Sequence, residues 1–212
     1  MENKSQRVAI IDLGVGNLRS VAHSFSMLGA NVIVTTDAAD IAAADRLVLP
    51  GVGAFAAYAD KLSGSGVREV LEREAREKGK PLLGICLGMQ VLATVSEEHG
   101  EHRGLGWIPG RVVKLDVANA PHLRVPHMGW NHLRPRGACP MLEGVGPEST
   151  FYFVHSYALR PDDPAHDVAD CEHGATFCAA VMHENLFATQ FHPEKSQRDG
   201  LRLLERFLAW KP

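Results

Sequence analysis

The sequence predicts an α/β protein with a mainly parallel central sheet, flanked by helices and extended by antiparallel strands. In the first third of the chain, short β-branched runs alternate with helical periods, a spacing typical of a parallel sheet with helices on both faces. In the second half, strand-like segments follow one another through Pro- and Gly-rich connections that contain no helix. This arrangement favours antiparallel pairing at one side of the sheet.

The first half begins with a strand and a helix. Val8–Ile11 is a short, apolar, β-branched run, which we expect to form a buried strand, and a turn at Gly14 and Gly16 follows it. Asn17 is the expected N-cap of a helix with one apolar face, and Gly29 ends that helix. Two further strands are expected at residues 31–35 and 46–49.

A surface helix is expected over Val67–Lys78, because its apolar residues fall on one side. Opposite charges four residues apart support this helix: they are Glu69 and Arg73, Glu72 and Arg76, and Glu74 and Lys78. Gly79 ends the helix, and Pro81 precedes a strand over residues 82–85.

The second half contains mostly strands. They are expected at residues 111–115, 151–159, 176–182 and 186–191. Glu184 and Asn185 lie where a hairpin turn would join the last two strands. The chain then ends in a helix whose apolar stripe includes Leu204 and Phe207.

Length and composition narrow the possible functions. A chain of 212 residues is expected to form one domain, residues 1–212, and its net charge of −3 gives no basic excess for binding nucleic acid. No apolar run is long enough to cross a membrane, and the polar Met1–Arg7 segment does not have the apolar core of a signal peptide. The four cysteines form no CxxC pair, so we expect reduced thiols and a cytoplasmic location.

The strongest chemical signal is the segment Gly84-Ile85-Cys86-Leu87-Gly88, directly after a predicted strand and before a helical period that reaches Val95. Glycines two residues before and after the cysteine permit the sharp strand-to-helix turn of a nucleophile elbow. The start of a helix next to the sulfur would favour the thiolate. The alternative is an ordinary buried cysteine, the commonest fate of this residue type.

A cysteine nucleophile needs a base, and His192-Pro193-Glu194 follows the predicted strand at residues 186–191. Residues i and i+2 of an extended chain project to the same side, so Glu194 can orient the imidazole of His192 towards Cys86. The alternative is that His192 merely ends a strand and Glu194 is solvated in a loop. A lone His-x-Glu in a chain with 11 histidines would mean little without the cysteine elbow.

A third element is Pro50-Gly51-Val52-Gly53, at the end of the strand at residues 46–49. Ligand sites of parallel sheets lie outside the carboxyl ends of the strands. We therefore expect backbone N–H groups of Gly51, Val52 and Gly53, together with Leu87, to form an oxyanion hole. Glycine-rich loops also follow strands for steric reasons alone.

Other motifs are weaker. Gly14-Val15-Gly16 begins like a dinucleotide fingerprint, but Arg19 occupies the position of the third glycine. His99 and His102 lie in an acidic segment without the HExxH spacing, so a solvated loop is the better interpretation. We therefore expect neither a cofactor nor a metal.

Together, the elbow, the glycine loop and His-Pro-Glu resemble the class I glutamine amidotransferases over essentially the whole chain. The resemblance implies a flavodoxin-like fold and a Cys86-His192-Glu194 triad that hydrolyses the glutamine side-chain amide through a cysteine thioester. It also implies that Gln90 contacts glutamine and that Ser156 and Tyr157 line the glutamine site.

Finer motifs resemble the glutaminase subunits of imidazole glycerol phosphate synthases, which act in histidine biosynthesis. These motifs are Gly14–Asn17, Pro50–Gly53, Met89, Gly104–Gly106, Pro126–Asn131 and Phe151–Tyr157. The resemblance implies a heterodimer with a (β/α)₈-barrel cyclase, which receives ammonia through an internal channel and switches the glutaminase on. The implied interface positions are Asn17, Trp130, Tyr152, His155 and Lys195.

Three alternatives remain open at this point. The chain could be a glutaminase that serves another synthase, such as one that makes pyridoxal phosphate. It could also be a self-contained cysteine hydrolase of flavodoxin-like architecture, which would act without a partner. The third is an inert interaction module, against which the intact set of Cys86, His192 and Glu194 argues.

Overall fold

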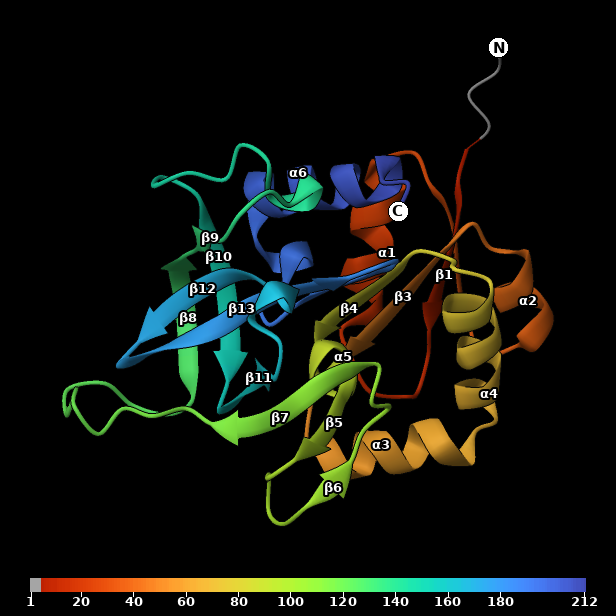
Figure 1. Ribbon diagram of the computed structural model, residues 1–212. Coiled ribbons are helices and arrows are strands. Elements are labelled where there is room, and N and C mark those ends of the chain that lie inside the picture. The colour runs from red at the N-terminus through yellow and green to blue at the C-terminus, as the bar shows by residue number, and fades with distance from the viewer. Residues whose placement is uncertain (1–4) are drawn as a thin grey trace.

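The computed structural model describes residues 5–212; Met1 to Lys4, part of the polar N-terminal segment, lie outside the described residues. Within them, eight strands form the main sheet in the order β2-β1-β3-β4-β14-β13-β12-β9 (Figure 1). In chain order these strands are β1 (Arg7–Ile11), β2 (Asn31–Thr35), β3 (Arg46–Gly51), β4 (Leu82–Cys86), β9 (Arg134–Pro135), β12 (Asp167–His173), β13 (Ala175–His183) and β14 (Leu186–Thr189). The pairs from β2 to β14 are parallel, and those from β14 to β9 are antiparallel. The predicted parallel sheet with an antiparallel extension is confirmed.

Helices cover both faces of this sheet. The helices are α1 (Leu18–Met27), α2 (Ala38–Ala43), α3 (Phe55–Gly64), α4 (Val67–Leu71) and α6 (Gln197–Ala209). Alternation along β1 divides the apolar core in two, because Val8 and Ile10 pack with α1 and α6 while Ala9 and Ile11 pack with the other three helices. Figure 1 shows α1 and α6 together on one side of the sheet.

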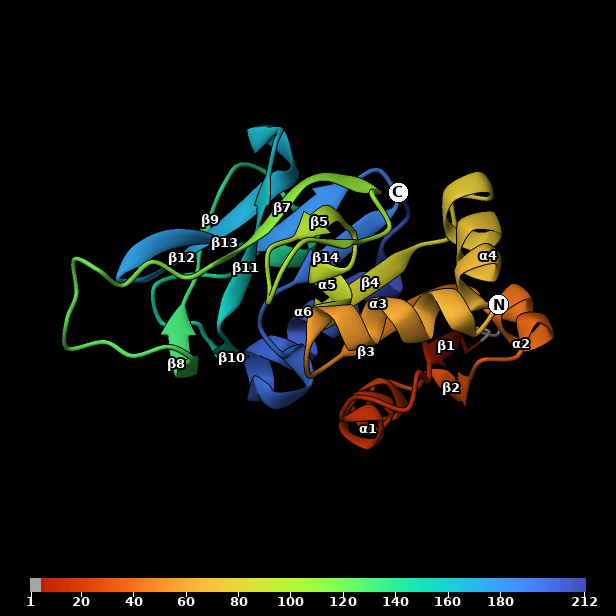
Figure 2. The same cartoon turned by 90° about the horizontal axis from the view of Figure 1, so that it is seen from below.

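The remaining strands form two smaller sheets. They are β5 (Ala93–Ser96), β6 (His102–Arg103), β7 (Ile108–Lys114), β8 (His127–His132), β10 (Thr150–His155) and β11 (Tyr157–Pro161). β10 pairs with β8, while β11, β7, β5 and β6 form a sheet in that order. Figure 2 shows β7 to β13 gathered at one side of the molecule, with α2 and α4 at the opposite side. Short helical turns occupy Leu87–Gln90 (α5), Pro140–Leu142, Pro164–His166 and Pro193–Lys195.

The helix predicted over residues 67–78 is α-helical only to Leu71 and continues as a π-helix over Glu72–Glu77. The wider turn brings Glu74 inward, where its side chain is 1% exposed and pairs with Arg73, Lys78 and Lys80. Of the three expected ion pairs, one is present: Nζ of Lys78 lies 2.9 Å from Oε1 of Glu74. Arg73 and Arg76 instead bind Glu74 and Glu184.

Three other expectations need correction. The helix after Cys86 ends at Gln90, because residues 93–96 pair with β7 as strand β5. The strand expected over residues 151–159 is interrupted at Ser156, since β10 pairs with β8 and β11 pairs with β7. Asn17 directly precedes α1, but its side chain makes no capping hydrogen bond.

No helix within residues 5–212 is long and apolar enough to cross a membrane.

Candidate active site

Cys86 is the last residue of β4 and begins a sharp turn into α5. Its φ of 55° and ψ of −108° place a non-glycine residue in a strained backbone region. The neighbouring strand β3 ends opposite it, with Gly51 in register with Cys86. The predicted elbow is therefore present, and it lies at the carboxyl edge of the parallel sheet.

The two glycines of the elbow are required by close backbone packing. A Cβ atom on Gly88 would lie 1.7 Å from the carbonyl oxygen of Leu49, and one on Gly84 would lie 2.8 Å from the carbonyl oxygen of Gly88. Neither position has room for a side chain, because backbone atoms cannot move aside as a flexible side chain can. The Gly-x-Cys-x-Gly spacing is thus a steric requirement of the turn.

His192 and Glu194 lie just beyond β14, the parallel neighbour of β4. The Nδ1 atom of His192 is 2.8 Å from Oε1 of Glu194, and the two side chains are 2% and 1% exposed. Burial lowers the pKa of His192, but the adjacent Cys86 sulfur, as a thiolate, and the Glu194 carboxylate favour the protonated ring and together raise the pKa to about 9. Nε2 of His192 is buried and has no hydrogen-bond partner within residues 5–212.

The backbone of His192 is held from β10. Its N–H donates to the carbonyl of Tyr152 at 2.9 Å, and its own carbonyl accepts a hydrogen bond from the Ser196 hydroxyl at 2.6 Å. The same Ser196 oxygen accepts from the N–H of Tyr152 at 3.0 Å. This closed set of bonds fixes the imidazole beside the elbow.

The glycine loop lies against the elbow and is restrained at its start. The Tyr58 hydroxyl donates to the carbonyl of Pro50 at 2.9 Å, and a Cβ atom on Gly51 would lie 2.6 Å from the Tyr58 ring. Burial, and then the charge of Cys86, raises the pKa of Tyr58, so its hydroxyl remains a donor. Gly53 has a φ of +103°, a conformation that favours glycine.

A pocket of about 260 Å³ opens over Cys86. Its lining contains the predicted residues Cys86, Val52, Gly53, Leu87, Gln90, Ser156 and Tyr157, and also His155, Val154, Pro126 and Glu98. Gly51 lies behind the lining, against Tyr58. Gln90 is oriented by its Nε2 atom, which donates to the carbonyl of Tyr157 at 2.8 Å.

Glu98 is a pocket residue that was not predicted from the sequence, where its surroundings indicated a solvated loop. Its carboxylate accepts a hydrogen bond from the N–H of Phe55 at 2.7 Å, and this bond holds the side chain at the pocket. No local pattern marks this residue, since only the packing of its turn against the start of α3 brings it there. The pocket lining therefore combines the thiol of Cys86, the imidazole of His155, amide groups and the carboxylate of Glu98, while His192 lies behind the lining.

The family model for class I glutamine amidotransferases matches residues 9–210 of the chain. The chain belongs to this family. It is accordingly an enzyme, a glutamine amidotransferase.

Curated relatives match over almost the whole length. The chain is 50% identical over 203 residues to "Imidazole glycerol phosphate synthase subunit HisH" of Syntrophotalea carbinolica, a match that covers 94% of this chain and 98% of that protein. It is 47% identical over 218 residues to the protein of the same name from Zymomonas mobilis, with 100% of both chains covered.

Solved structures share the fold of this amidotransferase. A putative GMP synthase subunit from Thermoplasma acidophilum superposes with a TM-score of 0.72 at 22% identity, covering 97% of this chain and 93% of that chain. PurLQS from Thermotoga maritima gives a TM-score of 0.71 at 18% identity, covering 97% and 98%. At these identities the likeness concerns the fold, and it agrees with the flavodoxin-like architecture expected.

Three of the expected interface residues meet on one surface of the amidotransferase. The rings of Trp130 on β8 and Tyr152 on β10 lie 5.9 Å apart, and Nζ of Lys195 lies 5.7 Å from the centre of the Tyr152 ring. His155, in contrast, is buried and lines the pocket over Cys86. Asn17 is half-buried at the residue before α1.

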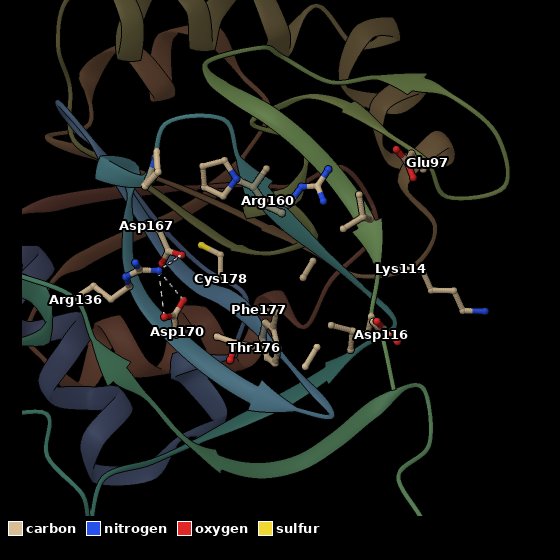
Figure 3. A pocket seen from close by; sticks show the side chains of 17 residues that line it. Glu97, Lys114, Asp116, Arg136, Arg160, Asp167, Asp170, Thr176, Phe177 and Cys178 are labelled. Atoms are coloured by element: carbon tan, nitrogen blue, oxygen red, sulfur yellow. Dashed lines mark hydrogen bonds and ion pairs between the residues drawn. The ribbon is translucent and has the colours of Figure 1, made fainter. Parts of the chain in front are cut away.

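A larger cavity of about 700 Å³ lies between β7 and β11 on one side and β12 and β13 on the other (Figure 3). Arg136 reaches both Asp167 and Asp170 there, at 3.4 and 3.2 Å. Burial, and then the neighbouring Asp170, raises the pKa of Asp167 to about 7. Burial raises the pKa of Cys178, which lines this cavity, and no histidine of residues 5–212 lines it, so the cavity contains no counterpart of the Cys86 and His192 pair.

Proposed function

We propose that this amidotransferase is the glutaminase subunit of an imidazole glycerol phosphate synthase. It hydrolyses glutamine to glutamate and ammonia, and it passes the ammonia to a cyclase subunit. The observation that carries the chemistry is the buried His192–Glu194 pair beside the strained Cys86, at a pocket that fits a small amide. The similarity to HisH proteins over nearly the whole chain supports the assignment to histidine biosynthesis.

The first half-reaction forms a thioester. The sulfur of Cys86 attacks the carboxamide carbon of glutamine, and the resulting oxyanion accepts hydrogen bonds from backbone N–H groups of the Gly51–Gly53 loop and of Leu87. His192 gives its proton to the departing nitrogen, so the C–N bond breaks and neutral ammonia leaves. The raised pKa of His192 suits this step, because the ring is protonated near neutral pH.

The second half-reaction releases glutamate. Neutral His192 removes a proton from water, which attacks the thioester carbon, and the C–S bond breaks to restore the Cys86 sulfur. Glu194 keeps Nδ1 of His192 protonated throughout, so Nε2 performs both transfers. No group outside the chain, glutamine and water takes part.

Polar groups of the pocket are suited to the other end of glutamine. We propose that the Glu98 carboxylate pairs with the α-ammonium group, while Gln90, Ser156 and Tyr157 contact the remainder of the substrate. A carboxylate held by the N–H of Phe55 is already oriented before the substrate arrives. This preorganisation favours glutamine over amides without an α-ammonium group.

The proposed partner is a cyclase with a (β/α)₈ barrel. Met128 and Trp130 on β8 are 63% and 47% exposed, which is unusual for large apolar side chains on a strand and supports docking at this face. A closed contact would also deliver ammonia before bulk water protonates it. Because the four cysteines are free thiols, we expect the complex to work in the cytoplasm, where thiols stay reduced.

Glutamate release tests the proposal when measured with the chain alone and with a cognate cyclase plus its nucleotide substrate. We expect little activity alone and a large rise in the complex. In the complex with Cys86→Ala, glutamine hydrolysis should disappear while cyclization with added ammonium salt persists. Full activity without a partner would instead indicate a self-contained hydrolase, and a response to a different synthase would reassign the pathway.

A further inference from the structure

A buried amide side chain outside the proposed triad touches the Cys86 sulfur. Gln190 follows β14 and is 0% exposed. Its Nε2 atom donates to Sγ of Cys86 at 3.7 Å, and its Oε1 atom accepts from Nε2 of Gln90 at 2.9 Å. One side chain thus links the nucleophile to a residue that lines the substrate pocket.

The carbonyl oxygen of Tyr157 determines which end of Gln190 faces the sulfur. A carbonyl can only accept, so the atom of Gln90 that lies 2.8 Å from it must be the Nε2 donor. That same Nε2 lies against Gln190, which must therefore present its oxygen there. The amide nitrogen of Gln190 is consequently the atom directed at Cys86.

The same carbonyl also orders a pair of histidines on its other side. Nδ1 of His155 lies 2.9 Å from it and must donate, so Nε2 of His155 accepts from Nδ1 of His127 at 3.2 Å. Nε2 of His127 then accepts from the side-chain amide of Asn131 at 3.2 Å. Both rings must be neutral for these bonds, which agrees with burial lowering the pKa of His155 to about 3 and that of His127 to about 4.

The position of Gln190 is unfavourable for a merely structural residue. An amide buried in an apolar sheet costs free energy unless it is hydrogen-bonded, and an aliphatic side chain of similar size would fill the same volume without that cost. The donor is directed at a sulfur atom, a weak acceptor as a thiol and a much stronger one as a thiolate. The hydrogen bond therefore strengthens when Cys86 ionises.

We propose that Gln190 is a positioning residue for Cys86, which orients the sulfur and stabilises its thiolate form through one amide N–H. Its other end ties this orientation to Gln90, so the nucleophile and the pocket wall are held in one hydrogen-bonded chain that is anchored at Tyr157. The inference rests on the proposed function only in taking Cys86 as the nucleophile.

Alkylation of Cys86 by iodoacetamide across pH tests this role without glutamine. Mass spectrometry of the Cys86 peptide distinguishes it from the three other cysteines, and the full chain is used. In Gln190→Met, which keeps the volume and removes the donor, we expect the midpoint of the rate profile to move up by about one pH unit, with alkylation about tenfold slower below it. Thr189→Val is the matched control, since this equally buried neighbour bonds only the Phe191 carbonyl, and its profile should equal that of the wild type.

An unchanged midpoint in folded Gln190→Met would overturn the inference. If that variant fails to fold by near-ultraviolet circular dichroism, Gln190→Glu decides: it keeps an acceptor for Gln90 and places a second oxygen towards the sulfur. Its midpoint should move up further, and an unmoved midpoint would again refute the role. Loss of the proposed function has a separate signature, because wild-type glutamate release would then be absent while the alkylation profiles still differ.

Discussion

Nδ1 of His192 lies 2.8 Å from Oε1 of Glu194, although only Pro193 separates the two residues along the chain. Because Pro193 begins a short 3₁₀ turn, the glutamate side chain folds back onto the imidazole of the preceding strand end. Both side chains are almost completely buried, so the interaction is poorly screened by water. The ring orientation and its protonated nitrogen are therefore set by a contact within one tripeptide.

Glu194→Gln should remove most of the activity without unfolding the protein. Glutamine keeps the shape, but it no longer stabilises the imidazolium, so we expect the pKa of His192 to fall below about 9 and glutamine hydrolysis in the complex to fall by about 10²- to 10⁴-fold. Titration of the His192 ring by NMR and glutamate release measure the two effects. Glu143→Gln, at an exposed site, is the control.

The same substitution should change the dependence of stability on pH. The pKa of His192 is raised from 6.5 to about 9, so the stabilisation that it provides is complete below pH 6.5 and is lost as the pH rises through 9. The difference in the free energy of unfolding between wild type and Glu194→Gln should thus be larger at pH 6 than at pH 9.5. Equal differences at the two pH values would argue against the ion pair.

Glu98→Gln should weaken glutamine binding more than it slows the reaction. Loss of the charge removes a contact that acts equally on bound substrate and transition state, so we expect KM to rise by about 10- to 100-fold with a small change in kcat. Steady-state glutamate release in the complex measures both constants. Glu97→Gln, whose side chain pairs with Arg111, controls for the loss of a neighbouring charge. A fall in kcat at constant KM would contradict the proposed contact.

Gly88→Ala should prevent the elbow from forming. The added methyl group would lie 1.7 Å from a backbone oxygen, and overpacking of a well-packed interior costs about 1–3 kcal/mol even where side chains can adjust. We expect more than about 3 kcal/mol of destabilisation, measured by urea unfolding. Gly64→Ala near the end of α3 has open space around it and should leave stability equal or slightly higher.

Acidification should destabilise the protein through its buried histidines. The pKa of His127 falls from 6.5 to about 4 through burial and then through His173 nearby, so its contribution is complete above pH 6.5 and is lost as the pH falls through 4. His127→Gln should lower stability at pH 7.5 and reduce the further loss between pH 7.5 and pH 5 by about 2 kcal/mol. Thermal melts at pH 7.5 and pH 5 measure these changes in stability. Exposed His122→Gln should behave as wild type in them. An equal acid loss in both variants would exclude His127 as the cause.

Asp167→Asn should stabilise the protein in alkaline solution. The pKa of Asp167 is raised from 3.8 to about 7, so the contribution of this carboxyl group to stability is greatest below pH 3.8 and is lost as the pH rises through 7. Removing the charge should raise Tm at pH 8 by about 5 °C, equivalent to roughly 2 kcal/mol, and by much less at pH 5. Differential scanning calorimetry with exposed Asp162→Asn as control makes the comparison. A lower Tm at pH 8 would mean that the bond to Arg136 outweighs burial.

The parallel half of the fold was predictable because its strands are short apolar runs with glycine or proline near their ends. The predictions that were wrong concern segments where pairing with a distant strand overrides the local sequence pattern. Met89, Leu92, Ala93 and Val95 have a helical period, yet Ala93 and Val95 belong to β5, where Ala93 is buried and Val95 is half-buried. Ser156 gives no sign in the sequence that the strand changes partner there.

In the candidate site, too, some residues could be predicted from the sequence and others could not. Cys86, His192 and Glu194 were predictable because each lies in a short motif whose spacing has a steric or orientational reason. Glu98 and Gln190 have no such motif: the first reaches the pocket through its bond to Phe55, and the second acts through contacts with residues about 100 positions away. Sequence spacing cannot report contacts that only the folded sheet creates.

Strand β14 lies between β4 and β13, although it is among the last elements of the chain to be synthesised. The centre of the sheet, and with it His192, can be completed only after residues 186–194 have left the ribosome. Before that moment the nascent chain contains Cys86 without the proposed base beside it, so under the proposed function a chain that lacks residues 186–194 cannot hydrolyse glutamine. The proposed triad is thus complete only once this late strand has been inserted between two strands that precede it in the chain.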